Sequence, residues 1–393
     1  MGLSSCQHDH AWPGHEPRSQ PDRGETSSCL RDGGTRSRNA NGLILAIALL
    51  CFTALGAAAE SFRIATFNTD LQRDGPGLLL RDILEANDTQ IEASLEVIAA
   101  TSPDILILQN FDFDLENRAL AAFNAALGKI ARPYPYLFAR RPNTGLRTEL
   151  DMDGNGRMAE PRDAQGYGRF SGQGGMAILS RHPIIKEDVQ DYSTLLWRDL
   201  PSALLPQTKD GAPFPSAEAQ NIQRLSTTAH WVVPFDVSGK ERVHILTFHA
   251  SPPVFDGPED RNGKRNHDEI MFWLHFLDGH FGAVPTAKFV IAGGANNDPQ
   301  GGEGLKPAIN ALLMDPRLQD TAPRSDGSMA ASGDPYDTAD WEDPDPGNLR
   351  VDYVLPSADW TVLDAGVYWP EGDAAGAAER ASNHRLVWVD LAF

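Results

Sequence analysis

The chain of 393 residues is long enough for one large domain or two, and it is 41% hydrophobic with 35 Gly and 28 Pro. That composition is typical of a globular protein with many loops. The formal net charge of −20 opposes nucleic-acid binding unless a local basic patch exists, and the longest basic stretch is only residues 261–265. The composition therefore disfavours a protein that binds DNA through a basic surface.

The N-terminal segment differs in character from the rest of the chain. Residues 1–41 are polar and show no periodicity, so we expect a disordered extension. The apolar run 43–55 lies between two arginines and a row of small residues, which indicates a signal peptide within residues 42–59. An uncleaved membrane anchor is the alternative, although the run is short for a span. We therefore expect a secreted or periplasmic protein with one domain over residues 60–393.

The cysteines lie outside this domain. All three, Cys6, Cys29 and Cys51, precede residue 60. Disulfide bonds therefore do not hold the predicted domain together, even in an oxidising compartment. The same distribution excludes a thiolate metal site and a cysteine nucleophile within the domain.

The first part of the domain alternates strands with helices. A strand over residues 61–68 is followed by a helix that opens at a capping box, Thr89–Glu92, and ends before Pro103. Residues 105–108 form a continuous apolar run typical of a strand buried on both faces, and a second helix is predicted over about 115–127. This alternation predicts an α/β fold.

The second part contains long loops between its regular elements. Strands are predicted over residues 175–181, 226–237, 242–250, 289–293, 350–355, 360–368 and 385–391. Helices are predicted over about 266–279, with Asn266 as its N-cap, and over 305–314. Polar, glycine-rich stretches predict loops over residues 141–174, 199–220 and 325–348.

Several apolar runs end in polar residues that form a recognisable series. The segments are Ala65-Thr66-Phe67-Asn68, Leu106-Ile107-Leu108-Gln109-Asn110, Thr247-Phe248-His249, Ala292-Gly293-Gly294-Ala295-Asn296, Arg350-Val351-Asp352-Tyr353-Val354 and Ser382-Asn383-His384-Arg385. Their order, spacing and residue types resemble the endonuclease/exonuclease/phosphatase superfamily over residues 62–393. The resemblance implies a DNase I-like, four-layer α/β sandwich in which two face-to-face mixed β-sheets are flanked by helices.

The resemblance also implies a chemistry, the metal-dependent hydrolysis of a phosphodiester or phosphomonoester with Mg²⁺ or Mn²⁺. Asp352 would orient His384, which would bind or protonate a phosphoryl oxygen. His249, Asn296 and Asn68 would contact the reacting phosphate, Asn68 also as part of the metal shell. The implied substrates are a phosphate-containing small molecule, a lipid headgroup or nucleic acid. The acidic composition favours the first two, and we expect a monomer.

The sequence departs from the family pattern at three carboxylates. Asn110 stands where the family has a metal-binding Glu, Gly294 replaces the Asp of Gly-Asp-x-Asn, and Asn383 replaces the Asp of Ser-Asp-His. A hard cation such as Mg²⁺ prefers anionic oxygen, so these changes predict an impaired or rebuilt site. The alternative function is a non-catalytic extracellular binding protein on the same fold.

Two other acids are candidates to replace the missing carboxylates. Alternate side chains on a strand face the same side, so Asp70 would share a face with Asn68, and Asp112 with Asn110. The predicted metal set is then Asn68, Asn110, Asp112, Asp70 and Asn383. The competing interpretation is that Asp112 is a solvated loop charge.

A basic group follows His249 in the chain. Arg261, Arg265 and His267 are candidates to hold an anionic substrate, as is Arg385 beside His384. For the first three the alternative is a salt-bridged start of the predicted helix.

A second metal-site pattern lies in the loop over residues 141–174. Asp151, Asp153 and Asn155 follow the D-x-D-x-N-G pattern of a calcium loop, and Asp163 stands next to the position of its last ligand. We therefore consider a structural Ca²⁺, with an ordinary Gly/Asp turn as the alternative.

Overall fold

The computed structural model describes residues 61–237, 239 and 241–392. The extension predicted for residues 1–41 and the signal peptide predicted for 42–59 lie outside this part of the chain. Among the described residues, no helix has both the length and the apolar character needed to cross a membrane.

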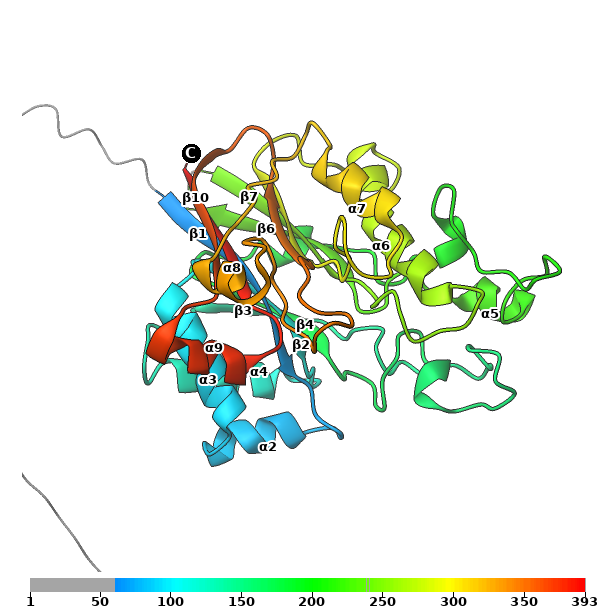
Figure 1. Ribbon diagram of the computed structural model, residues 1–393, viewed down its shortest axis with the longest axis horizontal. Helices are drawn as coiled ribbons and strands as arrows, with labels where there is room; N and C mark the ends of the chain where they lie inside the picture. Colours follow the sequence, from blue (N-terminus) through cyan, green and yellow to red (C-terminus); the bar gives the residue numbers. More distant parts are fainter. Residues whose placement is uncertain (1–60, 238, 240, 393) are drawn as a thin grey trace, which may run out of the picture. The chain divides into compact units, whose positions relative to one another are not determined.

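Two β-sheets form the centre of the fold (Figure 1). The first has the order β10-β11-β1-β2-β4-β3, and the second has the order β5-β6-β7-β8-β9. Each sheet contains one parallel pair, β1 with β2 and β7 with β8, among antiparallel neighbours, so both sheets are mixed. The strands are β1 (Ser61–Leu71), β2 (Ile105–Phe111), β3 (Tyr136–Phe138), β4 (Gly175–Ser180), β5 (Gln190–Asp191), β6 (His230–Val237), β7 (Glu241–His249), β8 (Phe289–Gly294), β9 (Asp352–Pro356), β10 (Thr361–Tyr368) and β11 (Leu386–Ala392).

The apolar faces of the strands explain the layers. In β2, Ile105 and Ile107 join a buried cluster shared by both sheets, whereas Leu106 and Leu108 pack on the helix side of the first sheet. A strand buried on both faces therefore needs the continuous apolar run seen in the sequence. Each fully buried side chain of this size contributes roughly 1.5–3 kcal/mol to the free energy of unfolding.

Helices cover the outer face of each sheet (Figure 1). The first sheet is covered by α2 (Leu78–Glu85), α3 (Thr89–Thr101), α4 (Arg118–Leu127) and α9 (Ala375–Ala381). The second sheet packs against α6 (Arg261–Leu277) and α7 (Lys306–Leu313). The predicted four-layer α/β sandwich is therefore confirmed.

Several predicted helix boundaries are wrong. The N-cap of α3 is Asp88, whose carboxylate accepts hydrogen bonds from the backbone of Gln90 and Ile91, so Thr89 is already helical. Helix α6 begins at Arg261 and not at Asn266, which is buried in its interior. Short helices also interrupt predicted loops, namely α5 (Ala217–Ile222) and α8 (Asp326–Ser332).

Two strand ends depart from regular pairing where polar residues begin. The register between β1 and β2 shifts between Asn68 and Leu71, and that between β2 and β4 shifts between Leu108 and Phe111. Within these irregular segments Asp70 and Asn110 have positive φ angles of 49° and 51°. Irregularities of this kind redirect side chains at the ends of strands, and they often lie beside functional sites.

Candidate active site

The polar segments singled out in the sequence meet at one end of the two sheets. Parallel pairing places Asn68 opposite Gln109 in the first sheet and His249 opposite Gly294 in the second. Asp352, the first residue of β9, pairs with Gly294 from the antiparallel side. The carboxyl ends of four strands and the start of a fifth therefore deliver their side chains to one region.

His384 and Asp352 form a buried pair at this end. The Nδ1 atom of His384 lies 2.7 Å from Oδ2 of Asp352, and the two residues are 5% and 0% exposed. Thr338 accepts a hydrogen bond from the backbone of Asp352 and donates one to its Oδ2. The ring of Trp341 meets the His384 ring edge-on, with centroids 5.2 Å apart. These contacts fix the orientation of the imidazole.

A chain of polar groups continues from His384 to an acid on β1. Nδ2 of Asn68 lies 3.1 Å from Nε2 of His384, and Oδ1 of Asn68 accepts a hydrogen bond from Asn110 at 3.0 Å. The Asn110 amide also donates to Oδ1 of Asp70 at 3.2 Å, and Ser382 donates to the other Asp70 oxygen at 3.0 Å. Asp70 therefore joins Asn68 and Asn110 in one group.

The two histidines of the site have opposite pKa shifts. Burial alone would lower the pKa of His384, but the charge and hydrogen bond of Asp352, with the charge of Asp70, raise it overall. Burial and the nearby His384 lower the pKa of His249 to about 4. His249 is therefore neutral at pH 7, while His384 is the group suited to carry a proton.

Asn296 and His249 form the second half of the site. The Asn296 amide lies 3.3 Å from Nε2 of His249 and donates to the carbonyl of Ala250 at 2.7 Å. Asn296 itself has a φ angle of 50°, in the left-handed region. These contacts hold its side chain beside the imidazole.

Gly294 lies in close contact with His249 and Asp352. A Cβ atom built on Gly294 would lie 3.1 Å from Cδ2 of His249 and 3.4 Å from Oδ1 of Asp352. That Asp352 oxygen and Nδ1 of His249 are buried without a hydrogen-bond partner among the described residues. Buried polar atoms of this kind are normally satisfied, so they indicate a place for water or substrate.

Buried amides tie the loops that follow β7 and β8 to helix α6. Nδ2 of Asn266 donates to the carbonyls of Ser251 and Ala295, at 2.8 and 2.7 Å. Its Oδ1 accepts from Asn297, which also donates to the carbonyl of Leu305. The loops that carry His249 and Asn296 are therefore held by neutral amide groups.

Two of the predicted metal ligands do not join this group. Asp112 accepts hydrogen bonds from the backbone N–H groups of Arg73 and Gly174, at 2.9 and 2.8 Å, so both its oxygens are engaged. Burial raises its pKa to about 6. Asn383 is exposed, and its carbonyl accepts from the backbone of Asp340. The interpretation of Asp112 as a solvated loop charge is also wrong, because the residue is 5% exposed.

The predicted basic residues make hydrogen bonds to other groups of the protein. Arg265 is 7% exposed and donates to the carbonyls of four residues, Gln165, Arg224, Leu225 and Ser226. Arg261 donates to the carbonyl of Met152, and His267 lies 2.9 Å from Asp268. Arg385 is 2% exposed and donates to Asp340 and to the carbonyl of Ser382. These contacts give all four residues structural roles, and their predicted part in holding a substrate stays a prediction.

The predicted calcium loop brings three of its four residues together. The carboxylate oxygens of Asp151, Asp153 and Asp163 lie within 4.8 Å of one another. Asp151 also accepts from the backbone of Gly154 and Gly156, both at 2.7 Å. Asn155 instead turns its amide nitrogen toward Asp153, at 3.1 Å. The geometry is compatible with both a cation and an ordinary turn.

Three residues of the site escaped the sequence analysis. Thr338 and Trp341 lie in the stretch 325–348, which was interpreted only as a loop, and no pattern in the sequence marks them. Ser382 belongs to the Ser-Asn-His segment, and its link to Asp70 depends on a fold contact across 312 positions. Only its position beside His384 could have drawn attention to it.

The remaining acids suit a divalent cation held partly by its substrate. Asp70 supplies one carboxylate and Asn68 an amide oxygen, whereas Asn110 turns its amide nitrogen to both and would have to rotate its amide to offer oxygen. Mg²⁺ is usually bound by one or two carboxylates together with water and substrate phosphates. The donor set therefore fits such an ion, although it provides less negative charge than the family pattern.

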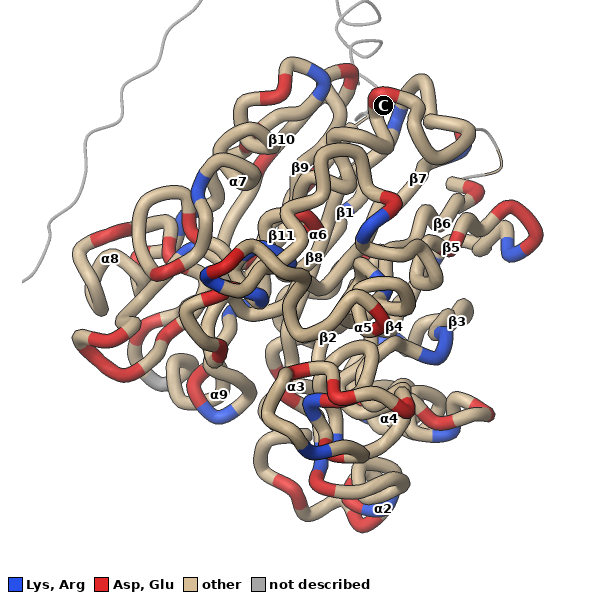
Figure 2. Tube along the Cα trace, turned by 90° about the vertical axis from the view of Figure 1, so that its right-hand side faces the viewer, with Lys and Arg blue, Asp and Glu red and all other residues tan. Residues whose placement is uncertain are grey.

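A cavity adjoins the segments that carry Asn296 and Asp352. Its volume is about 650 Å³, and Asp298 and Arg350 form part of its lining. Further acids, Asp320, Asp334 and Asp337, line the same cavity. Figure 2 shows acidic and basic residues interspersed along the surface loops. Among the charged residues that line this cavity, four aspartates accompany one arginine.

Comparisons with known proteins bear on the fold and on the family of this chain. Solved structures with a similar fold include an endonuclease/exonuclease/phosphatase from Beutenbergia cavernae, with a TM-score of 0.51 and 19% identity over 85% of this chain and 72% of that one. An endonuclease/exonuclease/phosphatase family protein from Leptotrichia buccalis has a TM-score of 0.49 and 16% identity over 84% of this chain and 100% of that one. Sphingomyelinase C from Streptomyces griseocarneus has a TM-score of 0.45 and 18% identity over 85% of this chain and 100% of that one. No curated protein matches the chain significantly. The sequence model of the Endonuclease/Exonuclease/phosphatase family matches residues 65–384, and the chain belongs to that family.

Proposed function

We propose that the protein is a metal-dependent phosphoesterase that hydrolyses a phosphodiester or phosphomonoester. The observation that carries the proposal is the continuous polar chain from Asp352 through His384 and Asn68 to Asp70. Family membership supports it, because the family contains largely phosphoester hydrolases. Fold alone does not establish an activity, so the proposal depends on this chain of contacts.

His384 is the group that handles the proton. With Nδ1–H donated to Asp352, a neutral ring accepts from the Asn68 amide at Nε2. Protonation turns Nε2 into a donor, so the Asn68 amide must then rotate and leave that N–H free for a phosphoryl oxygen. Asp352 and Asp70 both favour this protonated form. Donation of that proton would neutralise charge on a phosphoryl or leaving-group oxygen.

Neutral donors complete the binding of phosphate. The Asn296 amide and the neutral His249 lie beside each other and add no charge of their own. Hydrogen bonds from fixed amides and imidazoles stabilise the charge that develops on phosphoryl oxygens. The absence of a side chain at Gly294 avoids a close contact with His249.

Asp70, Asn68 and Asn110 are the residues that would hold a divalent metal, Mg²⁺ or Mn²⁺. A bound metal would supply Lewis-acid activation of the phosphate. With Asn110 and Gly294 in place of two family carboxylates, we propose weaker metal binding and a greater contribution from the substrate's own oxygens. A structural Ca²⁺ at Asp151, Asp153 and Asp163 stays a separate prediction.

The surroundings of the site favour a small substrate over a polyanion. The adjoining cavity is lined by four aspartates and by Arg350, which is paired with Asp320, so the remaining carboxylates disfavour a second phosphate. A small phosphoester or a lipid headgroup meets this requirement better than nucleic acid. Secretion or export to the periplasm is compatible with such substrates and remains a proposal based on the N-terminal sequence.

Hydrolysis of an aryl phosphodiester and an aryl phosphomonoester by the purified protein tests the proposal. Each substrate is assayed with Mg²⁺, Mn²⁺, Ca²⁺ or EDTA, beside His384→Ala and a matched His244→Ala control outside the site. We expect metal-dependent turnover that His384→Ala reduces by roughly 10²–10⁴-fold and His244→Ala leaves unchanged. Undiminished turnover by His384→Ala would refute the assigned role.

The second candidate function is an extracellular protein that binds an anionic ligand without catalysis. The observation that favours it is the loss of family carboxylates at Asn110, Gly294 and Asn383. Absence of turnover with every metal, together with phosphate binding that His384→Ala abolishes, would support this alternative.

A further inference from the structure

A second group of metal-ligating side chains lies at the C-terminal end of helix α6. Gly279 has a φ angle of 85°, and the N–H of His280 donates to the carbonyl of His275 at 3.1 Å. The N–H of Gly279 donates to the carbonyl of Phe276 at 2.9 Å. These two bonds form a Schellman motif, which turns the chain back and places His280 next to His275.

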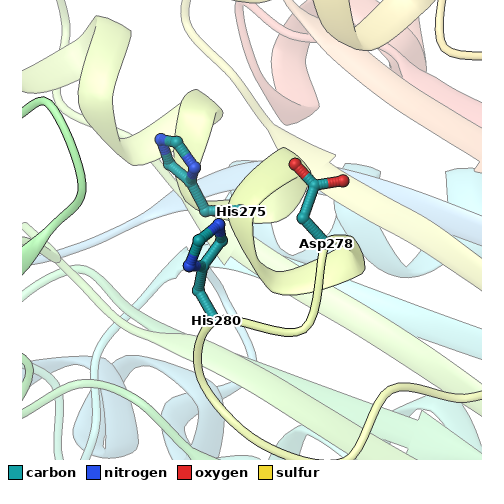
Figure 3. Close-up of side chains that lie close together, drawn as sticks. All are labelled: His275, Asp278 and His280. Carbon is teal, nitrogen blue, oxygen red and sulfur yellow. The ribbon is translucent and has the colours of Figure 1, made fainter.

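The turn brings two imidazoles and a carboxylate together. One potential ligand atom from each of His275, Asp278 and His280 lies within 4.8 Å of the others. The two rings are nearly perpendicular, with centroids 5.5 Å apart. Figure 3 shows all three side chains projecting from the last turn of α6 and the segment after it. His275 is partly buried, and the other two residues are exposed.

Groups outside the cluster hold two of its members. The carbonyl of Pro201 interacts with the His275 ring. Arg317 donates to Oδ1 of Asp278 at 2.8 Å, and Asp315 in turn holds Arg317 through two hydrogen bonds. A histidine ligand commonly donates its second ring N–H to a carbonyl, and carboxylate ligands are themselves hydrogen-bonded. The cluster therefore has the outer contacts expected around a metal ion.

We propose that His275, Asp278 and His280 bind a divalent transition-metal ion, of which Zn²⁺ is the best match. Two imidazole nitrogens and one carboxylate oxygen form a donor set typical of Zn²⁺, with water in the remaining position. Mg²⁺ and Ca²⁺ prefer oxygen ligands, so they suit this cluster poorly. The site is thus chemically distinct from the oxygen-rich group around Asp70.

The geometry requires only small movements. In a tetrahedral site with metal–ligand distances of about 2.1 Å, neighbouring ligand atoms lie about 3.4 Å apart. Separations of up to 4.8 Å therefore close by side-chain rotation of the exposed His280 and Asp278. The cluster also lies far from the catalytic loops, because the 12 positions from Asn266 to Asp278 correspond to about 18 Å along α6.

A bound ion would fasten the end of α6 to its surroundings. The segment after His280 is already linked to the end of β5. Tyr192, the residue that follows this strand, donates a hydrogen bond to the carbonyl of Phe281 at 3.1 Å. Asp278 connects the same turn to Arg317, which follows α7. A metal ion between the turn's side chains would therefore act as a structural clamp for these packed elements.

Zn²⁺ titration of the full, untagged chain by isothermal calorimetry tests the proposal. The N-terminal segment contains His and Cys residues that also bind metal, so the comparison is between variants of the same chain. The wild type is compared with His275→Ala/His280→Ala and with the matched control His244→Ala/His267→Ala. We expect the first double variant to lose one Zn²⁺ equivalent and the control to retain it.

Two further measurements separate binding from folding. The Tm of each variant in chelator is its own baseline, and Zn²⁺ should raise the Tm above that baseline for the wild type and the control only. Arg317→Gln should weaken binding at this site about 10–100-fold, because it removes an outer contact. An unchanged stoichiometry and affinity in His275→Ala/His280→Ala would overturn the proposal. The single variant His280→Ala applies the same test if the double variant does not fold.

Discussion

The buried, neutral His249 should make the stability of the protein fall as the pH is lowered. Burial and the nearby charge of His384 lower the pKa of His249 from 6.5 to about 4. Between pH 6.5 and pH 4, His249 is protonated in the unfolded chain but stays neutral in the folded protein. The stabilisation linked to His249 is therefore complete above pH 6.5 and is lost as the pH falls toward 4.

The magnitude follows from the two pKa values. At 1.36 kcal/mol per pKa unit, the change from 6.5 to about 4 corresponds to about 3 kcal/mol. On the order of 2 kcal/mol of this stabilisation is lost between pH 7.5 and pH 4.5. In His249→Gln the side chain does not titrate, and its amide oxygen remains able to accept from Asn296.

Urea denaturation of the wild type and His249→Gln at several pH values in chelator provides the assay. The difference between their free energies of unfolding should shrink by on the order of 2 kcal/mol from pH 7.5 to pH 4.5, since all other titrating groups are shared. His244→Gln is the matched control. That histidine is only partly buried, so its difference should change less. Parallel pH profiles for the wild type and His249→Gln would refute the reasoning.

Three other substitutions test the site and its framework. Asp70→Asn should weaken Mg²⁺ binding at least 10-fold, because it removes the carboxylate beside Asn110, and unchanged affinity by calorimetry would exclude Asp70 as a ligand. Arg265→Met should lower the free energy of unfolding by about 3–5 kcal/mol, because it leaves four buried carbonyls without their donor, and a loss below about 1 kcal/mol in urea would contradict this. Gly294→Asp restores a family carboxylate next to His249 and should bind Mg²⁺ more tightly than Gly294→Asn; equal affinities of the two variants would show that the position does not reach the metal.

The layered fold was predictable because its signals are local. Apolar runs such as residues 105–108 identified the buried strands, and the family resemblance supplied their arrangement. Helix boundaries were less accessible. Asp88 and Thr89 are both good N-caps, and only the structure shows which of them accepts the backbone hydrogen bonds. The first turn of α6 contains Gly263 and few apolar residues, so it resembled a loop.

The candidate site was predictable only in part. Asn68, Asp70 and Asp112 all follow apolar runs, and strict alternation treats the two acids alike. The register shift at the end of β1 brings Asp70 next to Asn110. Asp112 instead accepts hydrogen bonds from the backbone N–H groups of Arg73 and Gly174. The burial of Arg265 was equally hidden, because its four carbonyl partners come from segments about 40 and 100 positions away. Such long-range contacts leave no periodic signal in the sequence.

The neutral amides of Asn266 and Asn297 have a consequence for how this active site can evolve. They hold the loops of His249 and Asn296 through carbonyl groups of the backbone, and the buried Glu269 adds a hydrogen bond from the backbone N–H of Ser251. Replacement of a metal-binding carboxylate therefore alters the electrostatics of the site while its loops stay in place. On this scaffold, an acid at one strand end can be lost and another gained at a neighbouring strand end while the protein still folds.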